Sequence, residues 1–291
     1  MKWKIFIMCH NSIWDDMYSG DKDFSPQNYS FLKLGPSDLD FSKNRGYHIL
    51  NEFDLPIHIR DTHYAELTGL YAIYKNGLHC DLDFIGFSHY DKEHRLIGRS
   101  QDTNIDKLES TRLHVEESKE ANGPTDITNR IETYLQENPE GVHISLEAHD
   151  FQKIYSQKVM MDQGDPDGFV GDGVNCFDAI LDDYNSHFGT TFTMPDVAAD
   201  GYLTMCDCFV TSISIFEKLM KFLVPIIESR RLDIFDSKRQ HRLQGGLLER
   251  YVAVFFALEK IKKIEMSTFH QYWRKKKVTR YKAFLKSLGI L

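Results

Sequence analysis

The sequence lacks a long hydrophobic run, a cleavable leader and a cysteine framework. No apolar stretch approaches the roughly 18 residues that a membrane-spanning helix needs. The short apolar segment that begins at Ile5 has neither the length nor the cleavage site of a secretory signal. The five cysteines are an odd number without regular spacing. We therefore expect a chain that starts at Met1, stays in the cytoplasm and forms no disulfides.

Three common fingerprints are also absent. The chain contains no Gly-x-x-x-x-Gly-Lys-Ser/Thr, no Gly-x-Ser-x-Gly and no Gly-x-Gly-x-x-Gly, which argues against P-loop, α/β-hydrolase and dinucleotide-binding proteins. With 42% hydrophobic and 27% charged residues, the composition is that of a soluble globular protein and excludes a disordered or collagen-like chain. No repeat or dividing linker is visible, so we expect one domain over residues 1–273.

The net charge of -8 conceals an acidic body and a basic end. Seven of the 35 basic residues lie in residues 274–291, which contain no acidic residue, so the rest of the chain has 28 basic and 43 acidic residues. An acidic body repels nucleic acid, and we expect no such partner. Aromatic residues interleave with the terminal cations, as in amphipathic helices that bind anionic membrane surfaces. The alternative is a helix packed on the body with a solvated basic face.

The first third of the chain shows the pattern of an α/β protein. Residues 4–9 form a short apolar run, residues 66–76 have helical periodicity that ends before Gly77, and residues 84–87 form a second apolar run. A strand, a helix and a second strand in this order predict a mostly parallel sheet flanked by helices. In such sheets, polar side chains at the carboxyl ends of the strands form the binding site.

The remaining segments are less regular. Residues 12–62 contain several glycines and prolines and predict no definite element. The polar residues 98–124 predict a mobile loop or insertion, and such loops often close over substrates. Apolar patterns predict strands at 143–146 and 202–214, and helices at 126–138, 175–187, 216–229 and from Leu247 to about Lys262.

The polar segment 88–94 directly follows the second predicted strand. Asp91 and Glu93 can offer oxygens to one divalent cation, which neutralises a diphosphate, and His89 is a candidate further ligand or phosphate donor. A solvated loop of mixed charge is the alternative. The position after a buried strand favours a functional site.

A second candidate is the glycine pair Gly245 and Gly246 before the last predicted helix. Glycines let a ligand approach the backbone, and the first turn of a helix directs N–H groups at an anion. Glu249 lies nearby, and Arg250 can form two hydrogen bonds with a phosphate. The alternative is a plain glycine turn followed by a glutamate that complements the helix dipole.

Weaker patterns favour structural roles. His149 and Asp150 are adjacent and seldom share a face as an acid/base pair would need. Cys206 and Cys208 lack a second pair at zinc-ligand spacing, so buried structural cysteines are favoured. Residues 162–168 miss the spacing of a calcium-binding loop.

Three segments taken together, residues 4–11, 64–76 and 83–90, carry a specific resemblance. The second and third contain the block Glu-Leu-Thr-Gly-Leu-Tyr, then Tyr-Lys-Asn, then Gly-x-x-His-Tyr. This pattern resembles bacterial capsular and exopolysaccharide glycosyltransferases of a family long catalogued as a domain of unknown function and placed in the GT-A superfamily. Residues 216–220 and 245–250 are similar to its C-terminal half, so the resemblance spans about residues 3–265.

The resemblance implies a GT-A-like, Rossmann-like α/β fold. It also implies an enzyme that moves a sugar from a nucleotide-diphosphate donor to a hydroxyl of a glycan or lipid-linked glycan, in capsule, exopolysaccharide or O-antigen-type synthesis. Family members usually continue His-Tyr with two arginines, whereas Asp91 and Lys92 follow here. Asp91 with Glu93 looks more like the Asp-x-Asp metal clamp of other GT-A enzymes, which makes manganese or magnesium the implied cofactor.

The resemblance also implies individual roles. Asp91, with His89 and Glu93, would hold the metal on the diphosphate, because the leaving nucleotide needs its charge neutralised. Glu249 would deprotonate the acceptor hydroxyl. The residues implied in nucleotide-sugar binding come from the first strand, the helix that follows, the second strand and the glycine pair: His10, Asn11, Glu66, Gly69, His89, Gly245, Gly246 and Arg250.

Two other function classes stay open. A metal-dependent phosphoesterase would use His89, Asp91, His149 and Asp150, but no further ligands are found at metal spacing. A non-catalytic carbohydrate-binding protein could keep the same fold.

Overall fold

A computed structural model describes most of the predicted elements but not every candidate residue. The predicted loop beyond Gly98, the basic end, His10, Asn11 and Asp91 lie outside the described residues. The described residues are 1–9, 27–35, 47–60, 64–89, 92–98, 132–133, 135–145, 148–151, 155, 169–170, 174–204, 208–232 and 243–270.

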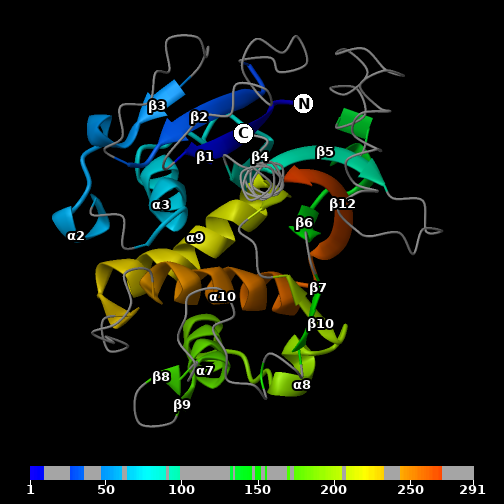
Figure 1. The fold of residues 1–291 in the computed structure, drawn as a ribbon. Coiled ribbons are helices and arrows are strands. Elements are labelled where there is room, and N and C mark those ends of the chain that lie inside the picture. The colour runs from blue at the N-terminus through cyan, green and yellow to red at the C-terminus, as the bar shows by residue number, and fades with distance from the viewer. Residues whose placement is uncertain are drawn as a thin grey trace, which may run out of the picture.

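Within these ranges, an eight-stranded sheet forms the centre of the fold, in the order β3-β2-β1-β4-β11-β6-β12-β5 (Figure 1). Strands β3, β2, β1 and β4 run parallel, as do β6 and β12, whereas β11 is antiparallel to β4 and β6, and β5 is antiparallel to β12. The predicted mostly parallel α/β sheet is confirmed. The strands are β1 Trp3–Cys9, β2 Tyr29–Lys33, β3 Tyr47–Ile49, β4 Phe84–His89, β5 Lys92–Gly98, β6 Gly141–Ser145, β11 Phe209–Ser212 and β12 Lys262–His270.

Strand β1 lies between β2 and β4 and is buried on both faces. Lys4 is its one residue that is not fully buried, and a strand covered on both sides is expected to read as a continuous apolar run. Its register brings Met8 beside His89 of β4 and Cys9 beside Lys33 of β2. The carboxyl ends of the three parallel strands therefore meet at one edge of the sheet.

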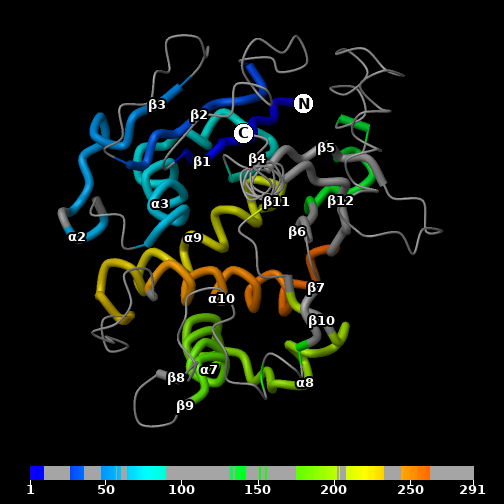
Figure 2. The backbone as a smooth tube through the Cα atoms, in the orientation of Figure 1, coloured from blue at the N-terminus to red at the C-terminus, as the bar shows by residue number. Residues whose placement is uncertain are grey.

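Four helices stack on the sheet in successive layers. Figure 1 shows α3 and α9 next to the strands, α10 across them and α7 beyond α10, and in Figure 2 strand β11 leads directly into α9. Two of these helices confirm predictions, since α3 ends just before Gly77 and α7 begins after the side-chain cap of Asn175. The four helices are α3 Leu67–Lys75, α7 Cys176–Phe188, α9 Ile213–Glu228 and α10 Leu243–Leu258.

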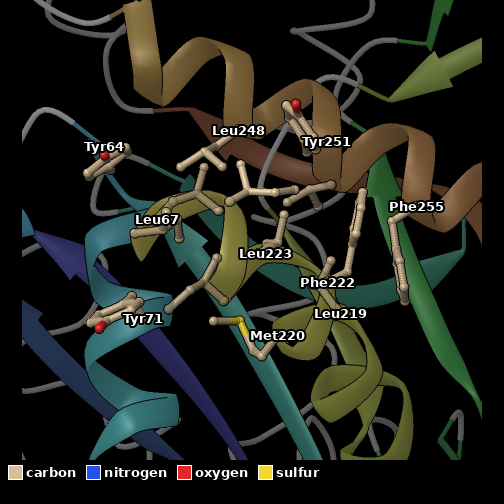
Figure 3. Close-up of a cluster of buried hydrophobic side chains, with 14 of the residues drawn as sticks. Tyr64, Leu67, Tyr71, Leu219, Met220, Phe222, Leu223, Leu248, Tyr251 and Phe255 are labelled. Carbon is tan, nitrogen blue, oxygen red and sulfur yellow. The ribbon is translucent and has the colours of Figure 1, made fainter. Parts of the chain in front are cut away.

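Helix α10 occupies the middle of the molecule. Leu248 and Tyr251 of α10 meet Leu223 of α9 and Leu67 of α3 in one apolar cluster (Figure 3). From Gly245 to Phe256 its residues are buried, with Glu249 only partly so. A helix that is apolar on all sides needs such enclosure, and burial then compensates for the low helix propensity of its two glycines.

The last part of the chain corrects the sequence-based prediction. The final helix begins at Leu243 rather than Leu247, and it ends at Leu258 rather than near Lys262. Lys260 adopts a positive φ of 56° without being a glycine, so the usual signal for a helix end was missing. Lys262 then starts β12, a strand that the sequence did not predict.

Smaller elements complete the described fold. They are η1 Leu50–Glu52, α2 Ile57–Arg60, α8 Met194–Val197, and the strand pairs β7 Ala148–Asp150 with β10 Tyr202–Thr204 and β8 Phe169–Val170 with β9 Val174–Asn175. In the described ranges no helix is both long and apolar enough to cross a bilayer. The cysteines described there, Cys9, Cys80, Cys176 and Cys208, form no disulfide with one another.

Tyrosine–carboxylate hydrogen bonds attach α7 to the rest of the protein. The Tyr251 hydroxyl of α10 donates to Asp183 Oδ2 over 2.6 Å. Tyr184 donates to Glu259, whose other oxygen accepts from Lys218 Nζ at 2.5 Å. Burial and the bond to Asp183 raise the pKa of Tyr251, so this hydroxyl stays a donor.

Replacing Tyr251 with Phe keeps the ring and removes the bond to Asp183. The free energy of unfolding should fall by about 1–2 kcal/mol, because a carboxylate loses a hydrogen-bond donor. Urea denaturation measures this loss. Tyr74→Phe is the matched control, since no hydrogen bond of the Tyr74 hydroxyl occurs in the described part of the chain. Equal losses in the two variants would contradict this role of Tyr251.

Candidate functional site

The described candidate residues meet at the carboxyl edge of β1 and β4. His89 is the last residue of β4, and Glu66 immediately precedes α3. Glu66 Oε1 lies 3.4 Å from His89 Nδ1, and the two side chains are only 11% and 13% exposed. A carboxylate and an imidazole, nearly enclosed and in contact, therefore stand where ligands of parallel α/β sheets bind.

An unusual backbone conformation directs Glu66 to this edge. Ala65 has a positive φ of 51°, which a residue with a Cβ adopts only when the surroundings impose it. The N–H groups of Leu67, Thr68 and Gly69 then donate to the carbonyls of Tyr64, Ala65 and Glu66 at 3.1, 3.2 and 3.0 Å. Three hydrogen bonds between residues three apart thus close the turn before α3 and fix where the Glu66 side chain starts. Neither this turn nor its role was visible in the sequence.

Gly69 brings α3 close to the sheet. A Cβ at this position would lie 2.4 Å from Met8 Sδ of β1 and 2.9 Å from Leu32 Cδ2 of β2. Met8 or Leu32 would have to move to admit a side chain here, so the glycine permits the close packing of α3 on β1 and β2. The structure gives Gly69 this packing role, and its predicted part in shaping the nucleotide side stays a prediction.

Gly245 holds α10 against the same turn. A Cβ on Gly245 would lie 2.9 Å from Ala65 Cβ and 3.2 Å from the carbonyl carbon of Tyr64. The prediction that Gly245 and Gly246 precede the helix is wrong, because both lie inside α10. The backbone that approaches Gly245 closely is the protein's own.

Arg250 and Glu249 lie one turn further along α10. Arg250 is 5% exposed, and its Nη1 donates to the carbonyl of Gly246 at 2.6 Å. Burial raises the pKa of the Cys176 thiol, and the nearby guanidinium of Arg250 opposes that shift. Glu249 is partly exposed. Their predicted roles at a phosphate and as a base stay predictions.

The predicted metal ligands are only partly described. Glu93 lies within β5, where it pairs with Phe269 of β12, so it is not in the solvated loop that was the alternative interpretation. Within the described residues, no group of three His, Cys, Asp or Glu side chains gathers as a metal site would require.

The weaker candidates occupy other elements. His149 and Asp150 belong to β7 and pair with Leu203 and Tyr202 of β10. Cys208 is fully buried ahead of β11, as expected for a structural cysteine. His149 and Asp150 are thus on a strand pair separate from the sheet that carries His89, whereas Cys208 precedes Phe209, which pairs with Phe87 of β4.

Comparison with known proteins identifies the family. Residues 4–260 match the family described as "Domain of unknown function (DUF4422)". The chain belongs to the DUF4422 family. No curated protein sequence matches it significantly.

A solved structure shares the fold of this DUF4422 chain. The apo structure of the WbbM bifunctional glycosyltransferase is similar with a TM-score of 0.56 and 14% sequence identity. The similarity covers 92% of this chain and 45% of WbbM, so the chain spans less than half the length of that protein. The α/β fold expected from the resemblance is thereby confirmed.

A methyl group at Gly245 should destabilise the protein. Gly245→Ala is expected to lower the free energy of unfolding by about 1–3 kcal/mol, the usual cost of overpacking. Ala65→Gly removes the nearest obstructing atom and the strain of a positive φ. Ala65→Gly should therefore raise the free energy of unfolding of the Gly245→Ala variant by more than it raises that of the wild type. Strictly additive changes in thermal or urea unfolding would show that the two positions are not in contact.

Proposed function

We propose that this chain is a glycosyltransferase that transfers a sugar from a nucleotide-diphosphate donor to a hydroxyl of a glycan or lipid-linked glycan. The setting would be synthesis of a capsule, exopolysaccharide or O-antigen-type polysaccharide. The observation that carries the proposal is the enclosed Glu66–His89 pair at the carboxyl edge of parallel strands. The fold shared with a glycosyltransferase over 92% of the chain supports it.

The donor would lie beyond the ends of β1 and β4. His89 can donate a hydrogen bond or carry a positive charge, and either suits the oxygens of a diphosphate. His10 and Asn11 follow β1 directly in the sequence and would complete the nucleotide side together with the start of α3. Ligands of open α/β sheets bind beyond the carboxyl ends of strands, which is the basis for this assignment.

A divalent cation is part of the proposal. Asp91 with Glu93 would hold manganese or magnesium, and His89 would serve either as a further ligand or as the hydrogen-bond donor to the diphosphate. When bound, such an ion would neutralise charge that develops on the leaving diphosphate. The described residues fit in one respect, because a histidine that binds a metal usually has a carboxylate at its other ring nitrogen, as Glu66 is at Nδ1.

The acceptor side is assigned to the start of α10. Glu249 would take the proton from the acceptor hydroxyl as that oxygen attacks the sugar. Gly245, Gly246 and Arg250 would help to bind the nucleotide-sugar beside it, with Arg250 held by its bond to the Gly246 carbonyl. General base catalysis by one positioned carboxylate typically contributes a rate factor of about 10²–10⁴.

Binding and transfer can be tested on the wild type and Asp91→Asn with UDP-, GDP- and dTDP-sugars, with Mn²⁺ or with EDTA. One donor should raise the melting temperature by several degrees, since a ligand at 100 times its dissociation constant stabilises by about 2.7 kcal/mol. Mn²⁺ should increase this shift in the wild type. Asp91→Asn should lose the increase and the sugar transfer while its ligand-free melting temperature stays unchanged.

Other outcomes would contradict specific parts. Undiminished transfer by Asp91→Asn in EDTA would exclude the metal clamp. Release of phosphate without preference for any sugar would indicate a phosphoesterase. A protein that only binds carbohydrate should gain no metal-enhanced stability from a nucleoside diphosphate.

The proposal includes a cytoplasmic enzyme whose residues 274–291 bind the anionic inner face of the membrane, near lipid-linked acceptors. Each basic residue near such a surface contributes about 1 kcal/mol. Sedimentation with liposomes that contain anionic lipid should recover the full-length chain in the pellet at low salt and release it at high salt. A chain truncated after Trp273 should stay in the supernatant. Equal recovery of both chains in the supernatant at low salt would leave the basic end a packing role only.

A further inference from the structure

The described residues contain two histidine–glutamate pairs at opposite ends of β4. His89 ends β4 and has Glu66 Oε1 3.4 Å from its Nδ1. His79 precedes β4 and has Glu217 Oε1 3.9 Å from its Nε2. Glu66 is nearly enclosed, whereas the Glu217 side chain is 42% exposed. The two pairs have similar chemistry in different settings.

We propose that Glu66 is a positioning residue, which holds the imidazole of His89 toward the diphosphate of the donor and does not itself bind the nucleotide. This inference rests on the proposed function and assigns Glu66 a different role from the one that the family resemblance implies. Glu66 acts on the ligand only through His89.

Charge is the first reason. Glu66 carries a negative charge at a nearly enclosed position, and a diphosphate carries the same sign. Two like charges a few ångströms apart in an enclosed site repel more strongly than in water. A protonated imidazole between them removes this conflict, because one of its N–H groups donates to the carboxylate and the other to the phosphate.

The backbone around Glu66 is the second reason. Ala65, with its positive φ, is packed against Gly245, and the carbonyl of Glu66 accepts from Gly69 N–H at 3.0 Å. A carboxylate on such a fixed turn can hold a neighbouring ring in one orientation with little loss of entropy on binding. The same fixed turn leaves Glu66 little freedom to follow a nucleotide.

The pair at His79 shows the contrasting arrangement. The His79 ring lies 5.2 Å from that of Tyr74 and 5.3 Å from that of Phe216, so aromatic packing orients it. Its carboxylate neighbour, Glu217, is at the exposed start of α9. Removing Glu217 therefore takes a carboxylate from a buried histidine without disturbing the edge at His89, which makes Glu217→Ala a matched control.

A double-mutant cycle separates positioning from direct binding. The dissociation constants of UDP and inorganic pyrophosphate are measured in EDTA by calorimetry for the wild type, Glu66→Ala, His89→Ala, the double variant and Glu217→Ala. Glu66→Ala and His89→Ala should each weaken both probes about tenfold, the loss expected for a charge-assisted hydrogen bond. The double variant should be no weaker than His89→Ala, and Glu217→Ala should match the wild type.

Independent losses from Glu66→Ala and His89→Ala that multiply in the double variant would overturn the proposal, since Glu66 would then act on the nucleotide directly. So would a loss for UDP without a loss for pyrophosphate. Glu66→Gln, which keeps the size of the side chain, replaces Glu66→Ala if the latter unfolds, and it should show the same lack of effect once His89 is removed.

A spectroscopic measurement reads the positioning without a ligand. The side-chain ¹⁵N shifts of His89 in the ligand-free protein should report a proton on Nδ1 in the wild type. They should report a changed tautomer in Glu66→Ala but not in Glu217→Ala. An unchanged His89 signal in Glu66→Ala would overturn the proposal. If neither probe binds the wild type while the tautomer changes as expected, the proposed function fails and the contact between Glu66 and His89 stands.

Discussion

The close approach of α10 to the turn before α3 is the contact on which the rest of the site depends. Gly245 leaves room for Ala65 where any larger residue would push the two helices apart. Helix α10 packs against α3 and α9 in the core (Figure 3) and against α7 on its other side (Figure 1), and this packing holds it against the turn. The turn in turn fixes Glu66 beside His89 at the end of β4. The packing of α10 in the core therefore determines the geometry of the site at the sheet edge.

Patterns within short segments predicted the parts of the fold that local forces decide. The strand β1 and the helix α3 were predicted directly from the sequence. A strand that is buried on both faces is a continuous apolar run, and a helix that is buried along one side has apolar residues at helical spacing. Strands β5 and β12 were missed, since both depend on pairing with each other across more than 150 residues of sequence. Charged edge strands carry little local signal. The glycine pair led to the wrong prediction that the helix begins after Gly246, because core burial, and not helix propensity, decides where α10 begins.

The sequence predicted which residues belong to the candidate site better than it predicted how they are arranged. The resemblance named Glu66, Gly69 and His89, and the structure brings Glu66 and His89 into contact. No sequence pattern predicted that contact, because the two residues lie on different elements and meet only when α3 packs on β1. Gly69 and Gly245 were read as ligand-facing glycines, and the structure shows close packing at both. Small residues permit close approach in either case, so the sequence alone does not distinguish a ligand from a neighbouring helix.

A crystal structure of the protein with a nucleoside diphosphate tests the central claim most directly. UDP, or whichever nucleoside diphosphate stabilises the protein best, would be soaked or co-crystallised with Mn²⁺. The account predicts its diphosphate beyond the carboxyl ends of β1 and β4, within hydrogen-bonding distance of His89, with the Glu66 carboxylate on the far side of the imidazole. A diphosphate bound elsewhere on the molecule, or one contacted by Glu66 and not by His89, would contradict it.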